Sequence, residues 1–246
     1  MAQRTPEASP RLKARVAGLL YLLTMVTGIF ALLAGGRLVV SGDAAATATN
    51  ILAHESLYRA AFAADLIMIA CYIAVTALFY ELFKPVNRSV SLVAAFFSLV
   101  ACAILGFSCL FHLAPLALLG GAPYLSVFNV EQLQALSLTF LRLNGQTYNI
   151  SMAFFGFYCL LIGYLIFRSA FLPRVLGGLM AFAGTSGLPF LWPPLAAYLS
   201  PYNTLPSLLG EGSLTLWLLV RGVNDQRWKE QASAAEERRW RHAVHS

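Results

Sequence analysis

Charged residues are scarce in this sequence. Only 11% of its 246 residues are Asp, Glu, Lys or Arg, and 59% are hydrophobic, whereas an ordinary soluble domain carries roughly 25% charged residues. Several uninterrupted apolar runs reach or approach the ~20 residues that a helix needs to span a bilayer. The alternating pattern of a β-barrel is missing, so α-helices are the only spanning form that we expect. The composition predicts an all-α polytopic membrane protein.

Cysteine and the common catalytic motifs are scarce or missing as well. The four cysteines all lie in apolar runs and form no Cys-x-x-Cys pair, which excludes a disulfide scaffold or a zinc ribbon. There is no His-Glu-x-x-His pattern, no Gly-x-Ser-x-Gly elbow and no glycine-rich phosphate loop. We therefore expect no cofactor and no resident metal, and the sequence leans away from an enzyme.

The apolar runs that are present give six candidate transmembrane helices in one bundle. They lie at about residues 12–34, 58–83, 89–119, 145–167, 174–191 and 203–221. A basic segment, residues 1–11, precedes them, and a polar tail, residues 222–246, follows with i,i+4 charge pairs that favour a helix. Between the spans we expect a short helix capped by Asp43 and a surface helix over Val130–Leu143.

The basic residues predict how the chain is threaded. With the N-terminus inside, 14 of the 17 Lys and Arg residues fall in cytoplasmic segments, and only Arg37, Arg59 and Arg142 fall outside. By the positive-inside rule both termini are cytoplasmic. Because this placement accounts for the formal charge of +6, we expect no nucleic-acid partner. The expected partners are the lipid bilayer and anionic headgroups at the basic cytoplasmic segments.

Five stretches resemble, in their order along the chain, the bacterial membrane family catalogued as domain of unknown function 4386. The stretches are Arg15–Leu23, Gly42–Ala48, Phe83–Arg88, Leu172–Gly177 and Gly210–Val223. The resemblance covers roughly residues 10–224. It implies a multi-pass protein of the bacterial cytoplasmic membrane, and it supplies no catalytic residue.

Three ionisable residues lie well inside the predicted spans, namely Asp65, His112 and Glu211. Counted from the predicted outer ends of their spans at ~1.5 Å per residue, all three lie in one layer of the outer leaflet. Gln146 and Asn149 open the fourth span on the same side. Each ionisable residue shares a helical stripe with small or polar side chains. We expect these five residues to form a site that binds a proton or a small molecule and serves transport.

Two alternatives remain for this cluster. It can be a polar knot that only holds the helices together, as in a structural or partner-binding membrane protein. It can also belong to an intramembrane hydrolase in which Asp65, His112 and Glu211 hold a metal, or in which Ser108 acts beside His112. Separately, the small residues of the Gly177–Gly184 ridge predict either close packing within the bundle or a homo-oligomer face.

Overall fold

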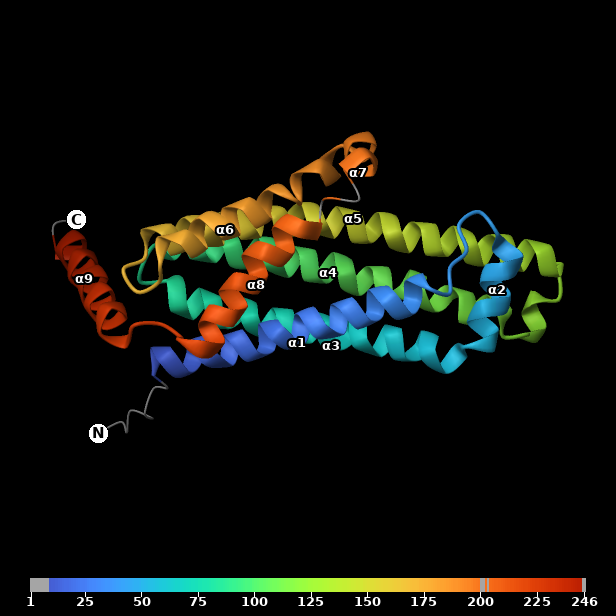
Figure 1. Cartoon of the computed structure of the whole chain (residues 1–246), viewed down its shortest axis with the longest axis horizontal. Coiled ribbons are helices and arrows are strands. Elements are labelled where there is room, and N and C mark those ends of the chain that lie inside the picture. The colour runs from blue at the N-terminus through green and yellow to red at the C-terminus, as the bar shows by residue number, and fades with distance from the viewer. Residues whose placement is uncertain (1–8, 200–201, 203, 245–246) are drawn as a thin grey trace. The chain divides into compact units, whose positions relative to one another are not determined.

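The computed structural model describes residues 9–199, 202 and 204–244, and all its regular elements are helices (Figure 1). Four helices are long and apolar enough to cross a membrane: α1 (Pro10–Gly36), α3 (Glu55–Phe83), α4 (Arg88–Leu119) and α5 (Val130–Arg168). Even the shortest has 27 residues, or ~40 Å at the usual helical rise. That exceeds the ~30 Å of hydrocarbon in a bilayer. The protein is a membrane-embedded, multi-pass helical protein.

The shorter elements connect and cover the long ones. They are α2 (Ala44–Ala53), η1 (Pro123–Leu125), α6 (Arg174–Thr185), η2 (Leu188–Leu191), α7 (Pro193–Leu199), α8 (Thr204–Val220) and α9 (Asp225–Val244). The start of α2 is as predicted, because the Ala46 backbone N–H donates to Asp43 Oδ1 at 2.9 Å. This cap satisfies one of the amide groups that a helix start leaves without a partner.

The chain packs into two compact units, which we describe separately. Unit 1 comprises Met1–Leu22, Ile73–Leu99 and Met152–Ser246, and unit 2 comprises Leu23–Tyr72 and Val100–Ser151. The division falls within each of the four long helices. Helices α6 to α9 belong wholly to unit 1, and α2 and η1 belong to unit 2.

Helix α5 differs from the prediction, which placed a surface helix before a separate fourth span. It is one continuous helix of 39 residues. The prediction ended the surface helix at Leu143 and began the fourth span at about Gly145, but a glycine inside a helix costs only ~1 kcal/mol. The Asn144 side chain is used instead for a hydrogen bond to the Ser108 carbonyl, at 2.9 Å. A side chain that competes with the backbone for hydrogen bonds weakens a helix, and here it is occupied elsewhere.

The fifth and sixth predicted spans are shorter and less regular than the first four. The fifth is α6, with 12 residues, followed by η2, and the sixth is α8, with 17 residues. Neither is long enough to count among the four candidate spans. The two helices pack against each other within unit 1, and α7 lies in the connection between them (Figure 1).

Glycines bring the helices of unit 1 into close contact. A Cβ atom built on Gly177 would lie 2.8 Å from the Gly163 carbonyl oxygen of α5, and one on Gly184 would lie 2.8 Å from the Gly156 carbonyl oxygen. Most of the predicted Gly177–Gly184 ridge thus packs inside the unit, although Gly178 faces open space. Small residues at such sites let helix backbones approach closely.

The C-terminal helix α9 is attached to unit 1. The Trp228 indole Nε1–H donates to the Leu82 carbonyl at 2.9 Å, in the last turn of α3. The Ala170 backbone N–H donates to Gln231 Oε1 at 3.0 Å. The last carbonyls of a helix have no partner within it, so α9 supplies a donor that the end of α3 lacks. The predicted polar tail is therefore a docked helix.

Candidate functional site

The predicted polar stripes face the interior of the helix bundle. Ser98, Cys102, Cys109 and His112 of α4 are all buried, as are Tyr58, Tyr72 and Thr76 of α3. Thr76 Oγ1 and Ser98 Oγ lie 2.6 Å apart. On α8, Thr215 is buried, and Ser207 and Glu211 are half-buried. Helical periodicity therefore predicted correctly which face of each helix turns inward.

Asp65 and His112 come together within unit 2. His112 Nδ1 lies 3.6 Å from Asp65 Oδ2, within the distance of an ion pair. The imidazole is 7% exposed, and it packs on the Tyr58 ring with a centroid distance of 4.4 Å. Asp65 lies ten residues after the start of α3, and His112 lies seven residues before the end of α4. Each is thus ~10–15 Å from one end of its helix.

Tyr58 also fixes the backbone beside His112. Its hydroxyl donates to the His112 carbonyl oxygen. Three residues later, Pro115 lies inside α4 and has no N–H to donate to the Phe111 carbonyl, which loosens the helix there. A tyrosine hydroxyl that binds a carbonyl in this turn holds α3 to α4. The imidazole is therefore placed by its own backbone as well as by Asp65.

The second ring nitrogen of His112 is the distinctive feature of this site. Within the part of the chain that the structure describes, Nε2 is buried and has no hydrogen-bond partner. Gly35 of α1 is the neighbour nearby, and a Cβ atom built on it would lie 3.9 Å from His112 Cε1. An unsatisfied buried nitrogen costs ~1–3 kcal/mol, so it is a natural position for a bound proton donor or acceptor.

Glu211 has a different set of partners, in unit 1. The Tyr21 hydroxyl of α1 donates to Glu211 Oε2 at 2.6 Å, and Ser207 Oγ donates to Oε1 at 2.9 Å. Tyr21 is fully buried. The predicted depth of Glu211 was counted from Asn203, which lies outside the described residues. Glu211 is ten residues before Arg221, ~15 Å along α8 from that basic end. The hydrogen-bond partners of Glu211 thus belong to unit 1, whereas Asp65 and His112 pair within unit 2.

Gln146 and Asn149 do not contribute to the buried pair. Both side chains lie on an exposed face of α5. Asn144, two residues before Gln146, turns toward α4 and donates to the Ser108 carbonyl. Ser108 Oγ in turn donates to the Leu105 carbonyl at 2.8 Å. The side chain that joins α5 to α4 in unit 2 is therefore that of Asn144, which lies on a different face of α5 from Gln146 and Asn149.

The residues needed for a metal site are not assembled. Across residues 9–199, 202 and 204–244, no three His, Cys, Asp or Glu side chains come together in a way that could hold a metal ion. One form of the hydrolase alternative has Asp65, His112 and Glu211 holding one ion. Asp65 and His112 lie in unit 2 and Glu211 lies in unit 1, where hydroxyl groups bind it.

The family model described as domain of unknown function (DUF4386) matches residues 16–222. The chain belongs to the DUF4386 family. No curated protein and no solved structure matches it.

The DUF4386 match includes all five predicted site residues and also two that sequence reasoning missed. Tyr21 and Asn144 lie within the matched range and supply the hydroxyl for Glu211 and the amide for the Ser108 carbonyl. A signal for Asn144 was available, since an asparagine in an apolar helix needs a partner. Tyr21 gave no such signal, because a tyrosine in a span resembles any other large apolar side chain.

Proposed function

We propose that this DUF4386 protein has six transmembrane segments, lies in the bacterial cytoplasmic membrane and has both termini in the cytoplasm. The distribution of charge supports this orientation. Among the described residues, unit 1 holds 13 Lys and Arg against six Asp and Glu, and unit 2 holds three against four. The units are defined by packing alone, yet most of the Lys and Arg residues fall in one of them. An uneven distribution of basic residues is what the positive-inside rule uses to predict orientation. In this proposal the basic segments of unit 1 face the cytoplasm.

The α6–α8 hairpin supports an even number of crossings. Arg174 begins α6, and Arg221 directly follows α8. Two helices of a hairpin begin and end on the same side, so these two arginines share one surface. Together α6 and η2 are ~26 Å long, and α8 is ~25 Å. These lengths approach the ~30 Å of the hydrocarbon layer, which supports counting them as the fifth and sixth segments.

We further propose that the Asp65–His112 pair is a proton-binding site of a transport-related protein. The main support is the geometry of the His112 imidazole. Its Nδ1 atom faces Asp65, and its Nε2 atom is buried without a hydrogen-bond partner among the described residues. Such an imidazole can hold one proton against the carboxylate and present Nε2 to a small polar molecule. The titratable neighbours are Tyr58 on α3 and Cys109 on α4, and neither is a cation that would replace the proton.

The Glu211 cluster supports a structural role alongside this site. Both carboxylate oxygens of Glu211 accept hydrogen bonds from hydroxyl groups, one on α1 and one on α8. The knot alternative thus fits Glu211 better than it fits His112, which keeps an unused nitrogen. The two clusters can be tested separately, because each has its own carboxylate.

Infrared difference spectroscopy of purified protein, recorded between acidic and neutral pH, tests the proton site. We expect a carboxyl or imidazole band in the wild type that is lost in Asp65→Asn and altered in His112→Gln. Glu211→Gln is the matched control, since it also neutralises an intramembrane carboxylate, and it should keep the band. An unchanged spectrum in folded Asp65→Asn would overturn the assignment.

A further inference from the structure

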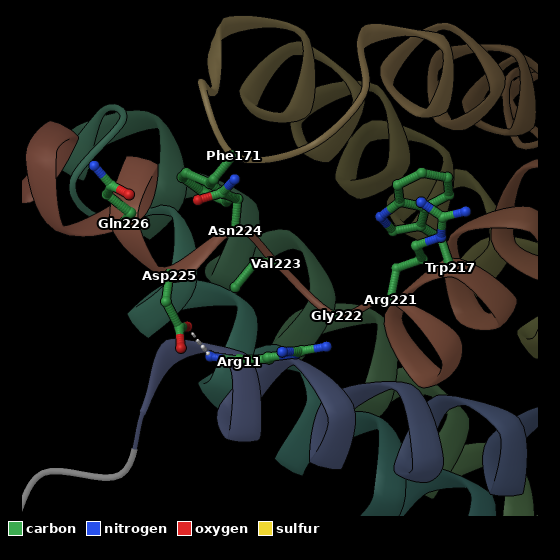
Figure 2. Close-up of a pocket in the computed structure, with 9 residues that line it drawn as sticks. All are labelled: Arg11, Phe171, Trp217, Arg221, Gly222, Val223, Asn224, Asp225 and Gln226. Atoms are coloured by element: carbon green, nitrogen blue, oxygen red, sulfur yellow. Dashed lines mark hydrogen bonds between the residues drawn. The ribbon is translucent and has the colours of Figure 1, made fainter.

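A cavity of about 440 Å³ opens in unit 1 where four segments meet. Its walls come from the first turn of α1, the 169–173 connection, the end of α8 and the start of α9. Figure 2 shows the side chains around it, among them Arg11, Phe171, Trp217, Arg221 and Asp225. The proton site and the Glu211 cluster use none of these residues.

The charge around this cavity is mainly positive. Arg11 and Arg221 line it, and both side chains are exposed. Among the described residues of the lining, Asp225 alone is acidic, and it already accepts the Arg11 backbone N–H at 2.7 Å. The Arg11 side chain runs away from that contact toward Gly222 (Figure 2), and its Cγ would lie 3.0 Å from a Cβ atom on that glycine. Both guanidinium groups therefore remain available for an anion.

A third arginine adds to this charge without lining the cavity. Arg15 Nη2 donates to the Val220 carbonyl oxygen at 3.4 Å, at the end of α8. Gly222, two residues after Val220, adopts a left-handed backbone conformation, with φ of 66°. This conformation suits glycine and ends α8 as a C-cap. The chain thus turns sharply from an apolar helix into the basic rim of the cavity.

The end of α8 places the cavity at a membrane interface. The Arg221 guanidinium lies 5.5 Å from the centre of the Trp217 ring and folds over it (Figure 2). Tryptophan and arginine at the end of an apolar helix are typical of the headgroup level. Two exposed apolar residues of α8, Leu216 and Val220, flank Trp217 and Arg221 along the chain. An acyl chain can lie along this apolar surface while its headgroup occupies the cavity.

We infer that this cavity binds the phosphate of an anionic phospholipid headgroup, with Arg11 and Arg221 as the cationic ligands. Guanidinium groups bind phosphate oxygens in a bidentate geometry. The cavity is a discrete site for one lipid, which distinguishes it from the general attraction between basic segments and an anionic leaflet. The leaflet concerned is the cytoplasmic one if the proposed orientation holds, but binding itself does not depend on orientation.

Native mass spectrometry of the full chain in neutral detergent tests this inference. The probes are phosphatidylglycerol, phosphatidylcholine with the same acyl chains, and inorganic phosphate. We expect the wild type to retain one phosphatidylglycerol in preference to phosphatidylcholine. Each arginine near an anionic headgroup contributes about fivefold in affinity, so Arg11→Gln/Arg221→Gln should bind phosphatidylglycerol about 25-fold more weakly.

Arg238→Gln is the matched control, because Arg238 is an exposed arginine of α9 outside the cavity lining. It should bind phosphatidylglycerol like the wild type. Equal binding by the double variant and the wild type would overturn the site, and inorganic phosphate that competes at the lipid's own affinity would overturn the assignment to a lipid. If circular dichroism shows that the double variant is unfolded, the single variants replace it, each with an expected loss of about fivefold.

Discussion

Two hydroxyl groups, those of Tyr21 and Ser207, donate hydrogen bonds to the carboxylate of Glu211. Hydrogen bonds between transmembrane helices contribute only ~1 kcal/mol or less. The Tyr21 ring also packs edge-on against Phe79, with centroids 5.9 Å apart. One phenol thus joins α1 to α8 through its oxygen and to α3 through its ring, all within unit 1.

Replacing Tyr21 with Phe removes the hydroxyl and keeps the ring. We expect Tyr21→Phe to lower the free energy of unfolding in mixed micelles by about 1 kcal/mol, because Glu211 loses its 2.6 Å donor. Tyr198→Phe removes the same atom from a side chain that is 81% exposed and should have no effect. Equal stability of the two variants would contradict the structural role of this hydrogen bond.

At this scale the sequence predicted the Asp65–His112 contact, which the structure contains. The contact followed from helical facing and from similar depths below the ends of α3 and α4, which are regular helices. Glu211 has hydroxyl partners of its own in unit 1. Gln146 and Asn149 are exposed on α5, where the predicted surface helix and the predicted fourth span form one helix that sets the face of each residue.

At the scale of helices, glycine positions decide how closely α5, α6 and α8 pack. A Cβ atom on Gly210 of α8 would lie 2.3 Å from the Leu179 carbonyl oxygen of α6. One on Gly187 would lie 2.5 Å from the Met152 carbonyl oxygen of α5. Both obstacles are backbone atoms, which cannot rotate away as a flexible side chain can. The hairpin therefore depends on glycine at these places.

Two glycines on either side of Glu211 allow a direct comparison. We expect Gly210→Ala to destabilise the protein by about 1–3 kcal/mol through overpacking. Gly212→Ala should be neutral or slightly stabilising, since a Cβ atom there meets nothing within 4 Å and alanine favours the helix. Chemical unfolding of both variants in the same micelles measures the difference. Equal stability would show that α8 does not pack on α6 as described.

Apolar runs predicted the existence of the helices better than their ends. The first three spans match α1, α3 and α4 closely, because a run of 20 or more apolar residues has few alternatives to a helix. The fifth span failed to continue, since it passes through Gly187 and Pro189 into the short turns of η2. Such local turns depend on the close contact with α5, which the sequence alone does not show.

At the scale of the whole chain, charge and packing give the same division. All the described basic residues of the predicted cytoplasmic segments belong to unit 1, and Arg37, Arg59 and Arg142 belong to unit 2. The proton site lies in the unit poor in basic residues, and the proposed lipid site lies in the basic unit. Orientation therefore determines on which side of the membrane each site acts.

Fusions to alkaline phosphatase, which is active only outside the cytoplasm, test this account most directly. The enzyme would be joined after Val86, Ala122, Tyr202 or Asn224 of the chain, with expression of each fusion checked by immunoblot. We expect activity after Ala122 and Tyr202 and none after Val86 and Asn224, because Val86 and Asn224 lie beside the basic segments that the positive-inside rule assigns to the cytoplasm. Activity after Val86, or none after a well-expressed Ala122 fusion, would contradict the orientation and the placement of the Asp65–His112 site.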